Sequence, residues 1–384
     1  MKRPELMDLY TDFLTSSPQI ASALVMAKVL NDTYSHDSIT RMLAQSEISQ
    51  KDYWRSIKKL VRRVEHEEGV ISIDDFICHK PHSKQNEIIA YHYDHTSGRS
   101  ERGINIVSFT YVNRQIKPKV KIPIAFEIIR KDTEETKTVK DKKTKKFVQK
   151  TSRKASIGKN ELLRNRLKIL THQNNIKYRY ITFDTWYSSA ENMKFIVNDL
   201  KKHFVCAIKA NRRITFDLAV QDKPKKEQEW LSVSEADIEP DCPYKIKLKK
   251  IPFTLILVKK VFHNLNGTIG VQYLVTSDTE LTADNCSTIY KDRWSSEDVH
   301  RSLKQNAALE KMPAKMERSQ ANHIFAAMIA QVKLEAIKMA TKTNHYTLKR
   351  NILMDALKQA WIHIQKLKEL CLEKSIDLPN FLTA

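Results

Sequence analysis

Apolar positions recur with the period of an α-helix through the first 68 residues. One segment begins at Ser49, a residue type that often caps helices, and carries five apolar residues on one face: Trp54, Ile57, Leu60, Val61 and Val64. A shorter helix begins at Ser35 and carries Ile39, Met42 and Leu43. Two helices joined by a tight turn fit either a helix-turn-helix or a plain helical bundle.

After Gly69 the apolar positions alternate, as they do in half-buried strands. The pattern predicts strands at 70–76, 104–112 and 120–129, then a helix at 160–172, a strand at 178–184, a helix at 189–202 and a strand at 204–209. The order β-β-β-α-β-α-β predicts an α/β fold with a mixed sheet in residues 69–213.

Three further segments have their own character. Residues 130–159 hold twelve Lys or Arg against four Asp or Glu, which fits a DNA-contacting arm or a solvated loop; we favour the arm. Residues 214–287 contain short alternating strands separated by prolines and predict a β-rich insertion. From residue 288 the pattern is helical, with one helix in 288–316 and a C-terminal helical region in 317–384.

The excess of basic residues indicates which class of partner the protein binds. Lys and Arg number 66 and Asp and Glu 45, so the net charge is +21, which favours a polyanion such as nucleic acid. None of the six glycines begins a phosphate-binding loop. The longest apolar runs are too short to span a membrane. The five cysteines form no C-x-x-C pair, which fits a reducing cytoplasm rather than a disulfide framework.

A charged constellation follows residue 288. At about 100° per residue, Tyr290, Arg293, Glu297 and Lys304 project from one stripe of a helix, with Arg301 beside them. A carboxylate can hold a divalent metal ion, and neighbouring cations can hold phosphates close to it. The same spacing also fits an exposed face of ion pairs.

The pattern Y-x2-R-x3-E-x6-K resembles the signature of one large group of bacterial insertion-sequence transposases with a DDE catalytic triad. Other stretches are similar to that group in the same order: SHDSITRMLA, SIDDF, HYDHTSGRSERGINIVSF, ITFDTWYSSAENM and VQYLVTSD. The resemblance covers nearly the whole chain. It implies an RNase H-like mixed sheet that the β-rich insertion interrupts, flanked by N-terminal and C-terminal helical regions.

The resemblance implies a catalytic triad of Asp75, Asp184 and Glu297 that holds two Mg²⁺ ions, for which Mn²⁺ would substitute. The choice between Asp74 and Asp75 is open, because alternation puts them on opposite faces of the strand and the family pattern favours Asp75. The family usually has Thr after this pair, whereas this chain has Phe76, which puts the local geometry in doubt.

The resemblance also implies partners. Tyr290, Arg293 and Lys304, with Arg301 beside them, would contact DNA phosphates, and residues 1–68 would recognise terminal inverted repeats. Two subunits would act on paired ends in the bacterial nucleoid and join those ends to target DNA. The alternative is a catalytically inactive, transposase-derived DNA-binding protein; the presence of all three acids argues against it.

Two weaker signals remain. His79, His82, His92 and His95 have a spacing that could hold zinc, but the stretch also fits a polar turn between strands, which we favour. Trp230 could stack on an unpaired base, with Trp186 and Trp294 as alternatives, although core packing of the insertion is the simpler interpretation for Trp230.

Overall fold

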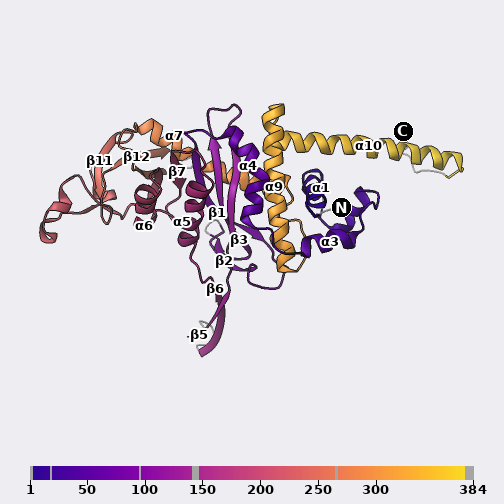
Figure 1. The fold of residues 1–384 in the computed structure, drawn as a ribbon, viewed down its shortest axis with the longest axis horizontal. Coiled ribbons are helices and arrows are strands. Elements are labelled where there is room, and N and C mark those ends of the chain that lie inside the picture. Colours follow the sequence, from indigo (N-terminus) through magenta and orange to yellow (C-terminus); the bar gives the residue numbers. More distant parts are fainter. Residues whose placement is uncertain (1–2, 18–19, 95–96, 141–146, 264–266, 377–384) are drawn as a thin grey trace.

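A computed structural model describes residues 3–17, 20–94, 97–140, 147–263 and 267–376. One mixed sheet of eleven strands runs through the molecule, with helices on both faces (Figure 1). Its strand order is β10-β9-β11-β12-β13-β8-β7-β1-β3-β2, and β4 also pairs with β3.

The centre of the sheet has the predicted order. β1 (Val70–His79) pairs antiparallel with β3 (Arg99–Asn113) and parallel with β7 (Tyr180–Phe183). β7 pairs parallel with β8 (His203–Ile208), and β4 (Val120–Ile128) pairs antiparallel with β3. The prediction of an α/β, RNase H-like mixed sheet is therefore confirmed. The sequence pattern missed edge strand β2 (Ala90–Asp94), which lies where a polar turn was expected.

Helices cover the two faces of this sheet. Near the β7 and β8 strands lie α5 (Lys159–Lys168) and α6 (Ala190–Lys194), each extended by a π-helical turn, η1 (Ile169–Gln173) and η2 (Phe195–Asp199). Helix α8 (Trp294–Asn306) packs on β1, β3 and β4, and α7 (Ala283–Lys291) packs on β7, β8 and β13.

The strands of the β-rich insertion continue the main sheet rather than form a separate layer. β13 (Ile269–Thr276) pairs with β8, and β12 (Leu255–His263) and β11 (Pro243–Leu248) follow. The short β9 (Arg213–Thr215) and β10 (Leu231–Ser232) end that side, with 3-10 turns η3 (Val220–Asp222), η4 (Lys225–Glu227) and η5 (Val233–Glu235). Buried apolar residues of β13 and β8 pack in one cluster, which explains why the insertion continues the main sheet at this point.

The N-terminal segment holds α1 (Arg3–Ser16), α2 (Ala23–Val29), α3 (His36–Ala44) and α4 (Gln50–Val64). Ser49 caps α4 in a capping box with Asp52, as the sequence suggested. Helix α4 packs on the sheet: the Tyr53 and Phe126 ring centroids are 5.3 Å apart, edge to face. The second helix of the suggested helix-turn-helix is thus also a layer of the core.

The basic segment forms a hairpin of β5 (Thr133–Lys140) and β6 (Phe147–Lys154), which extends away from the body (Figure 1). Residues 141–146 of the predicted arm lie outside the described residues. After the signature region come α9 (Glu317–Thr341) and α10 (His345–Glu373), and α10 projects from the body. No helix in the described ranges is long and apolar enough to cross a membrane.

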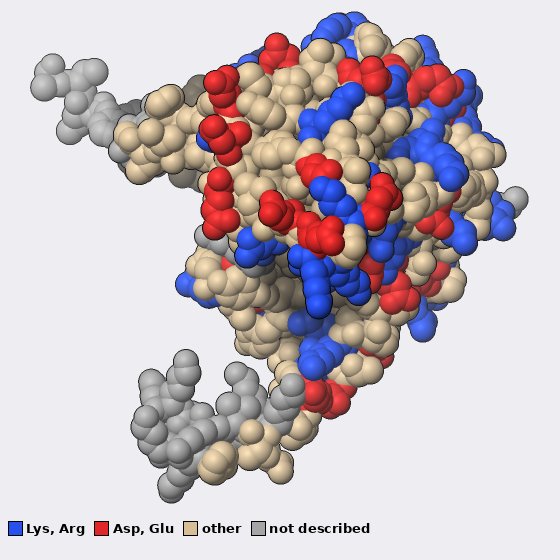
Figure 2. Space-filling model, turned by 90° about the vertical axis from the view of Figure 1, so that its left-hand side faces the viewer, with Lys and Arg blue, Asp and Glu red and all other residues tan. Residues whose placement is uncertain are grey.

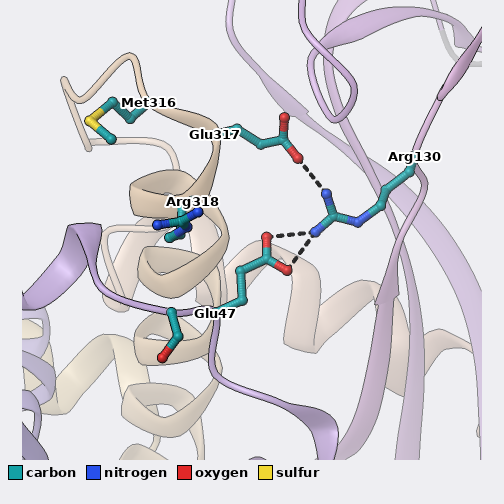
Figure 3. A pocket seen from close by; sticks show the side chains of 6 residues that line it. Glu47, Arg130, Met316, Glu317 and Arg318 are labelled. Carbon is teal, nitrogen blue, oxygen red and sulfur yellow. Dashed lines mark hydrogen bonds and ion pairs between the residues drawn. The ribbon is translucent and has the colours of Figure 1, made fainter.

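The base of the hairpin is tied to two other segments by Arg130 (Figure 3). Its guanidinium donates to both carboxylate oxygens of Glu47, at 2.6 and 2.8 Å, and forms an ion pair with Glu317 at the start of α9. Burial and these two carboxylates act on the pKa of Arg130 in opposite directions, and the net shift is upward. Arg130 thus joins the N-terminal, sheet and C-terminal segments.

We expect Arg130→Gln to lower the free energy of unfolding by about 1 kcal/mol, because a half-exposed network is worth more than an isolated surface pair. Urea denaturation of the full chain measures this. Arg99→Gln is the matched control, since Arg99 pairs with Glu101 from a largely exposed position. Equal effects of the two substitutions would show that Arg130 is an ordinary surface ion pair.

Candidate active site

Three acidic segments meet at one edge of the sheet centre. The parallel register of β1 and β7 sets Ile73 beside Phe183, so Asp74 and Asp184 follow at the same edge. Glu297 lies in the first turn of α8, which packs on β1. The topology therefore brings together the carboxylates that the sequence separates by more than two hundred residues.

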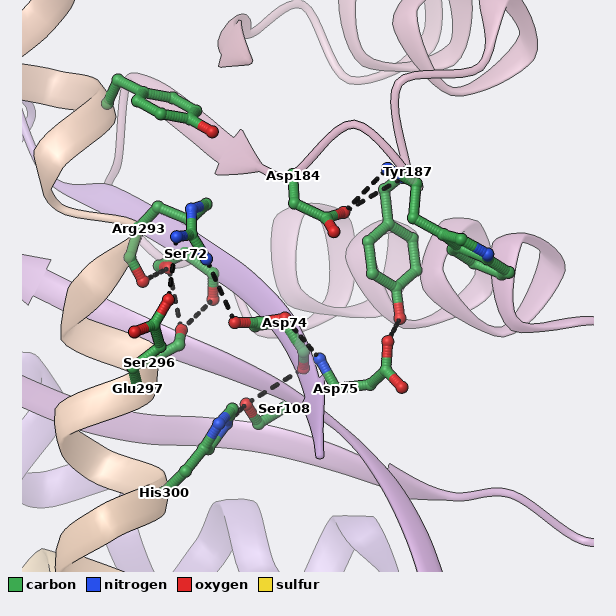
Figure 4. A network of polar contacts seen from close by, with 12 residues as sticks. Ser72, Asp74, Asp75, Ser108, Asp184, Tyr187, Arg293, Ser296, Glu297 and His300 are labelled. Atoms are coloured by element: carbon green, nitrogen blue, oxygen red, sulfur yellow. Dashed lines mark hydrogen bonds and ion pairs between the residues drawn. The ribbon is translucent and has the colours of Figure 1, made fainter. Parts of the chain in front are cut away.

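Asp74 and Glu297 share one cation (Figure 4). Arg293 Nη1 lies 3.3 Å from Asp74 Oδ2, and Arg293 Nη2 lies 2.8 Å from Glu297 Oε1. Two serines fix α8 against β1: Ser72 Oγ donates to the Arg293 carbonyl at 3.0 Å, and Ser296 Oγ donates to Ser72 Oγ at 2.8 Å. Ser72 and Asp74 therefore face α8, as alternation along the strand predicts.

The pKa values of Asp74 and Asp184 are both raised, as expected for carboxylates that lie close together. Burial raises the pKa of Asp74 to about 7 against the attraction of Arg293, and repulsion by Asp184 and Asp75 adds to the rise. Burial also raises the pKa of Asp184, although the backbone N–H groups of Tyr187 and Trp186 donate to its carboxylate. Such a cluster attracts a cation.

Asp75 has a different environment on the opposite face of β1. Its Oδ2 accepts from Lys159 Nζ at 2.6 Å and from Asn105 Nδ2 at 3.0 Å, and its Oδ1 accepts from the Tyr187 hydroxyl at 2.8 Å. Burial acts to raise the pKa of Asp75, but Lys159 and these hydrogen bonds outweigh it, so the pKa is lowered. Asp75 is thus a charged, fully paired carboxylate.

Phe76, the residue after the two aspartates, packs on the signature helix. Its ring centroid lies 4.1 Å from that of His300, with an interplanar angle of 32°. The buried His300 Nε2 lies 2.6 Å from Ser108 Oγ, and burial lowers the pKa of His300 to about 3. A neutral imidazole is therefore sandwiched between Phe76 and Ser108, which accounts for an apolar ring at position 76.

The predicted single helix through the signature is wrong in one respect. Helix α7 ends at Lys291 and α8 begins at Trp294, so Tyr290 lies on the first helix and Glu297 on the second. The buried Asp292 carboxylate between them pairs with Arg114 and Lys119, and backbone bonds of the i to i+3 type replace the regular pattern. The chain from 307 to 316 is also not helical.

The remaining signature residues are only partly gathered at the acids. Tyr290 is buried, with the Arg293 guanidinium 5.9 Å from its ring centroid. Lys304 Nζ donates to the Ile77 carbonyl at 3.0 Å and pairs with Glu310 at 3.1 Å. Arg301 is exposed. Burial raises the pKa of Tyr346 at the start of α10, and the nearby Arg301 opposes that rise.

Sequence reasoning missed the residues that hold the two aspartates in place: Lys159, Asn105, Tyr187, Ser72 and Ser296. All five lay in stretches already singled out for other reasons: Ser72 in SIDDF, Asn105 in HYDHTSGRSERGINIVSF, Lys159 in the basic segment 130–159, Tyr187 in ITFDTWYSSAENM and Ser296 in the signature. Alternation along β1 was the one available signal, since it places Ser72 beside Asp74 on the face of α8.

The donor set suits a hard divalent cation, which prefers carboxylate oxygens. The residues fit, because Asp74 and Asp184 are partly buried carboxylates whose repulsion a metal ion would relieve. In the described parts of the chain, however, no three His, Cys, Asp or Glu side chains are already arranged around a metal position. This also covers His79, His82 and His92 of the suggested zinc site; His95 lies outside the described residues.

An RNase H-like sheet with acids at the ends of β1 and β7 and on a later helix defines a class: nucleases that carry out metal-dependent phosphoryl transfer. Two family models match the chain: "DDE superfamily endonuclease" over residues 2–229 and "Transposase DDE domain" over residues 139–332. Each spans at least half of the 384 residues, so the chain belongs to the DDE transposase superfamily. No curated protein matches the chain.

Proposed function

We propose that this protein is the transposase of a bacterial insertion sequence, of the group with the Y-R-E-K signature. It cuts DNA at the ends of the element and joins those ends to target DNA. The observation that carries the proposal is the meeting of Asp74, Asp184 and Glu297 around Arg293. Membership of the DDE transposase superfamily supports the same reaction class.

Asp184 and Glu297 are the second and third acids of this proposal, as the sequence suggested. For the first acid we propose Asp74 instead of Asp75, which the family pattern favoured. Asp74 faces Glu297 through Arg293, whereas three side chains of the protein already bind the Asp75 carboxylate. In this assignment Asp75 holds Lys159 and Tyr187 in position.

Asp74, Asp184 and Glu297 would hold two Mg²⁺ ions, or Mn²⁺ in their place. These ions would supply Lewis-acid chemistry, namely activation of the attacking water or 3′-hydroxyl and stabilisation of the leaving 3′ oxygen. Arg293 bridges two of the acids and would supply a cation beside the scissile phosphate. Ser72, Ser296 and Ser108 keep α8, and so Glu297, at a fixed position against β1 and β3.

Charge supports duplex DNA as the substrate. The net charge is +21, and each phosphate contact by Lys or Arg releases condensed counterions. On the face shown in Figure 2, Lys and Arg side chains gather around the hollowed lower centre, with acidic side chains above. Residues 1–68, with the basic outer face of α4, are proposed to bind the terminal repeats, and Tyr290, Arg293, Arg301 and Lys304 the nearby phosphates.

Helix α10 supports a homodimer on paired DNA ends. Beyond its first turns it contacts little of the body, and apolar residues stay exposed along it: Leu357, Trp361, Ile362, Ile364, Leu367, Leu370 and Leu372. An exposed apolar surface of this kind marks an interaction site. We propose that the α10 helices of two subunits pair while both subunits act in the nucleoid.

The test uses the purified full chain and a DNA fragment that contains the gene with its natural flanks. In Mg²⁺ we expect new 3′-hydroxyl ends at inverted repeats, and Glu297→Gln should lose them while it still binds the fragment. End mapping by primer extension measures the cuts. Tight binding without cuts in Mg²⁺ or Mn²⁺ would overturn the proposal in favour of a non-catalytic DNA-binding protein. Cuts without joined products would reduce it to a nuclease.

A further inference from the structure

Exposed aromatic rings and cations lie together on the Asp75 side of the site. Trp186 is 44% exposed, although it stands only two residues after Asp184. Tyr91 and Tyr93, on the outward face of edge strand β2, are 48% and 58% exposed. We call this group, with its three cations, the basic–aromatic track: Trp186, Lys159, Lys131, Tyr91, Arg102 and Tyr93.

The first part of the track contacts Asp75 through Lys159 and Tyr187. Lys159 Nζ lies 2.6 Å from Asp75 Oδ2 and 5.3 Å from the centre of the Trp186 ring. The Trp186 ring meets Tyr187 edge to face, with centroids 4.7 Å apart, and the Tyr187 hydroxyl donates to Asp75. The Trp186 ring is therefore held by its neighbours while a large part of its surface stays open.

The second part continues along β2. Lys131 Nζ donates to the Tyr91 carbonyl, and the Arg102 guanidinium lies 5.7 Å from the Tyr91 ring centre. Lys131 and Lys159 are close enough to repel each other, since burial and then Lys159 lower the pKa of Lys131. Such repulsion is relieved when an anion binds between two cations.

One buried group marks the centre of the track. His92 lies between Tyr91 and Tyr93 in the sequence, but its side chain is only 7% exposed. Burial, with Lys131 and Lys159, lowers its pKa to about 3, so the imidazole is neutral. Its Nε2 is buried and has no hydrogen-bond partner among the described residues.

Rings that alternate with cations suit one class of ligand. Phosphates bind the cations, and bases stack on the rings, but the faces of bases are available only when the strand is unpaired. We propose that the basic–aromatic track binds a single-stranded segment of DNA that leads from the carboxylates along β2. This inference rests on the proposed function only for the identity of the nucleic acid.

The experiment measures binding without cleavage, in EDTA, by fluorescence anisotropy. The probes are a blunt duplex and the same duplex with a short single-stranded tail, each with the full chain. We expect the double variant Tyr91→Ala/Trp186→Ala to bind the tailed duplex at least about tenfold more weakly, with little change on the blunt one. Lys131→Gln should reduce the salt dependence for the tail by about one phosphate contact.

The matched control is Tyr91→Phe/Trp186→Phe, which keeps two stacking faces and should retain most of the preference for the tailed DNA. Equal losses on both probes would overturn the inference in favour of a duplex backbone contact. No loss on either would show that the rings are structural. If the wild-type protein preferred tailed DNA but never cut DNA in Mg²⁺, the proposed transposase function would be overturned and the inference about the basic–aromatic track would still hold.

Discussion

Replacement of Asp74 by Asn is expected to abolish DNA cleavage, whereas Asp75→Asn should leave a measurable fraction of it. Both aspartates interact with Asp184, but only Asp74 shares Arg293 with Glu297, so Asp74 belongs to the group that a metal ion would neutralise. Loss of one ligand from such a group costs several kcal/mol of transition-state stabilisation, roughly a 10³-fold fall in rate. Asp75 acts through Lys159 and Tyr187, so its loss should cost about tenfold or less.

Stability provides a second readout that separates the two aspartates. Asp74→Asn removes a partly buried, repelled carboxylate, so the metal-free protein should be as stable as the wild type or more stable at pH 8. Asp75→Asn leaves Lys159 without its carboxylate and should lower the free energy of unfolding by about 1–3 kcal/mol. Urea denaturation in EDTA measures both.

The outcomes discriminate cleanly. If Asp75→Asn abolished cleavage while Asp74→Asn preserved it, Asp75 would be the first acid and the family pattern would have been the better guide. If both abolished cleavage, the pair would act together, and Mn²⁺ titration of each variant would show which one weakens metal binding. Arg293→Lys serves as a control, since it keeps the charge but loses the fork that bridges Asp74 and Glu297.

The centre of the sheet could be predicted because its strands are short runs rich in apolar and β-branched residues, most of which are buried in the fold. That pattern located β1, β3, β4, β7 and β8 and the helices between them. It failed at β2, where the histidine-rich stretch from His79 to His95 suggested a polar turn. β2 pairs with the next strand, β3, with Asp94 opposite Arg99, but its sequence AYHYD contains no Val, Ile or Leu to mark a strand. The pattern also failed at Asp292, whose partners Arg114 and Lys119 are distant in the chain.

The candidate site was predictable to the same extent. Asp184 and Glu297 stand in stretches with strong motifs, so the sequence alone singled them out. The choice between Asp74 and Asp75 depends on which face of β1 meets α8, and Ser72 and Ser296 decide that through a contact across 224 residues. Lys159 could not be found from its surroundings in the sequence, because α5 brings it to Asp75 only in the folded chain.

Glu335→Ala is expected to be among the most destabilising substitutions in the chain. The Glu335 carboxylate is fully buried where α9, α10 and β4 meet. It accepts from the Lys121 backbone N–H at 2.7 Å and from Lys338 Nζ at 2.5 Å, and His345 Nε2 lies 3.1 Å away. Its removal leaves the buried Lys338 without a carboxylate, which should cost about 3–5 kcal/mol of unfolding free energy.

The control is a surface ion pair between α1 and the same helix, α9. Lys333 pairs with Asp8 and Asp12 at the surface, so Asp8→Ala should cost under about 1 kcal/mol. A double variant, Glu335→Ala/Lys338→Met, should recover part of the loss, because both buried charges are gone. Equal effects of Glu335→Ala and Asp8→Ala in urea denaturation would show that the buried cluster contributes no more than a surface pair.

The pH dependence gives the sign of the Glu335 contribution. Burial acts to raise the pKa of Glu335, but His345 and Lys338 outweigh it, so the folded pKa lies below the ordinary value of 4.5. The unfolded chain therefore binds more protons, and the stabilisation is present above pH 4.5 and lost as the pH falls through the folded pKa. The difference in stability between the wild type and Glu335→Ala should accordingly be constant near neutral pH and shrink below pH 4.5. His345 is the first residue of α10. The backbone amides of α10 should therefore lose hydrogen-exchange protection in Glu335→Ala before those of β1. That result would link the buried cluster to the helix that is proposed to pair two subunits.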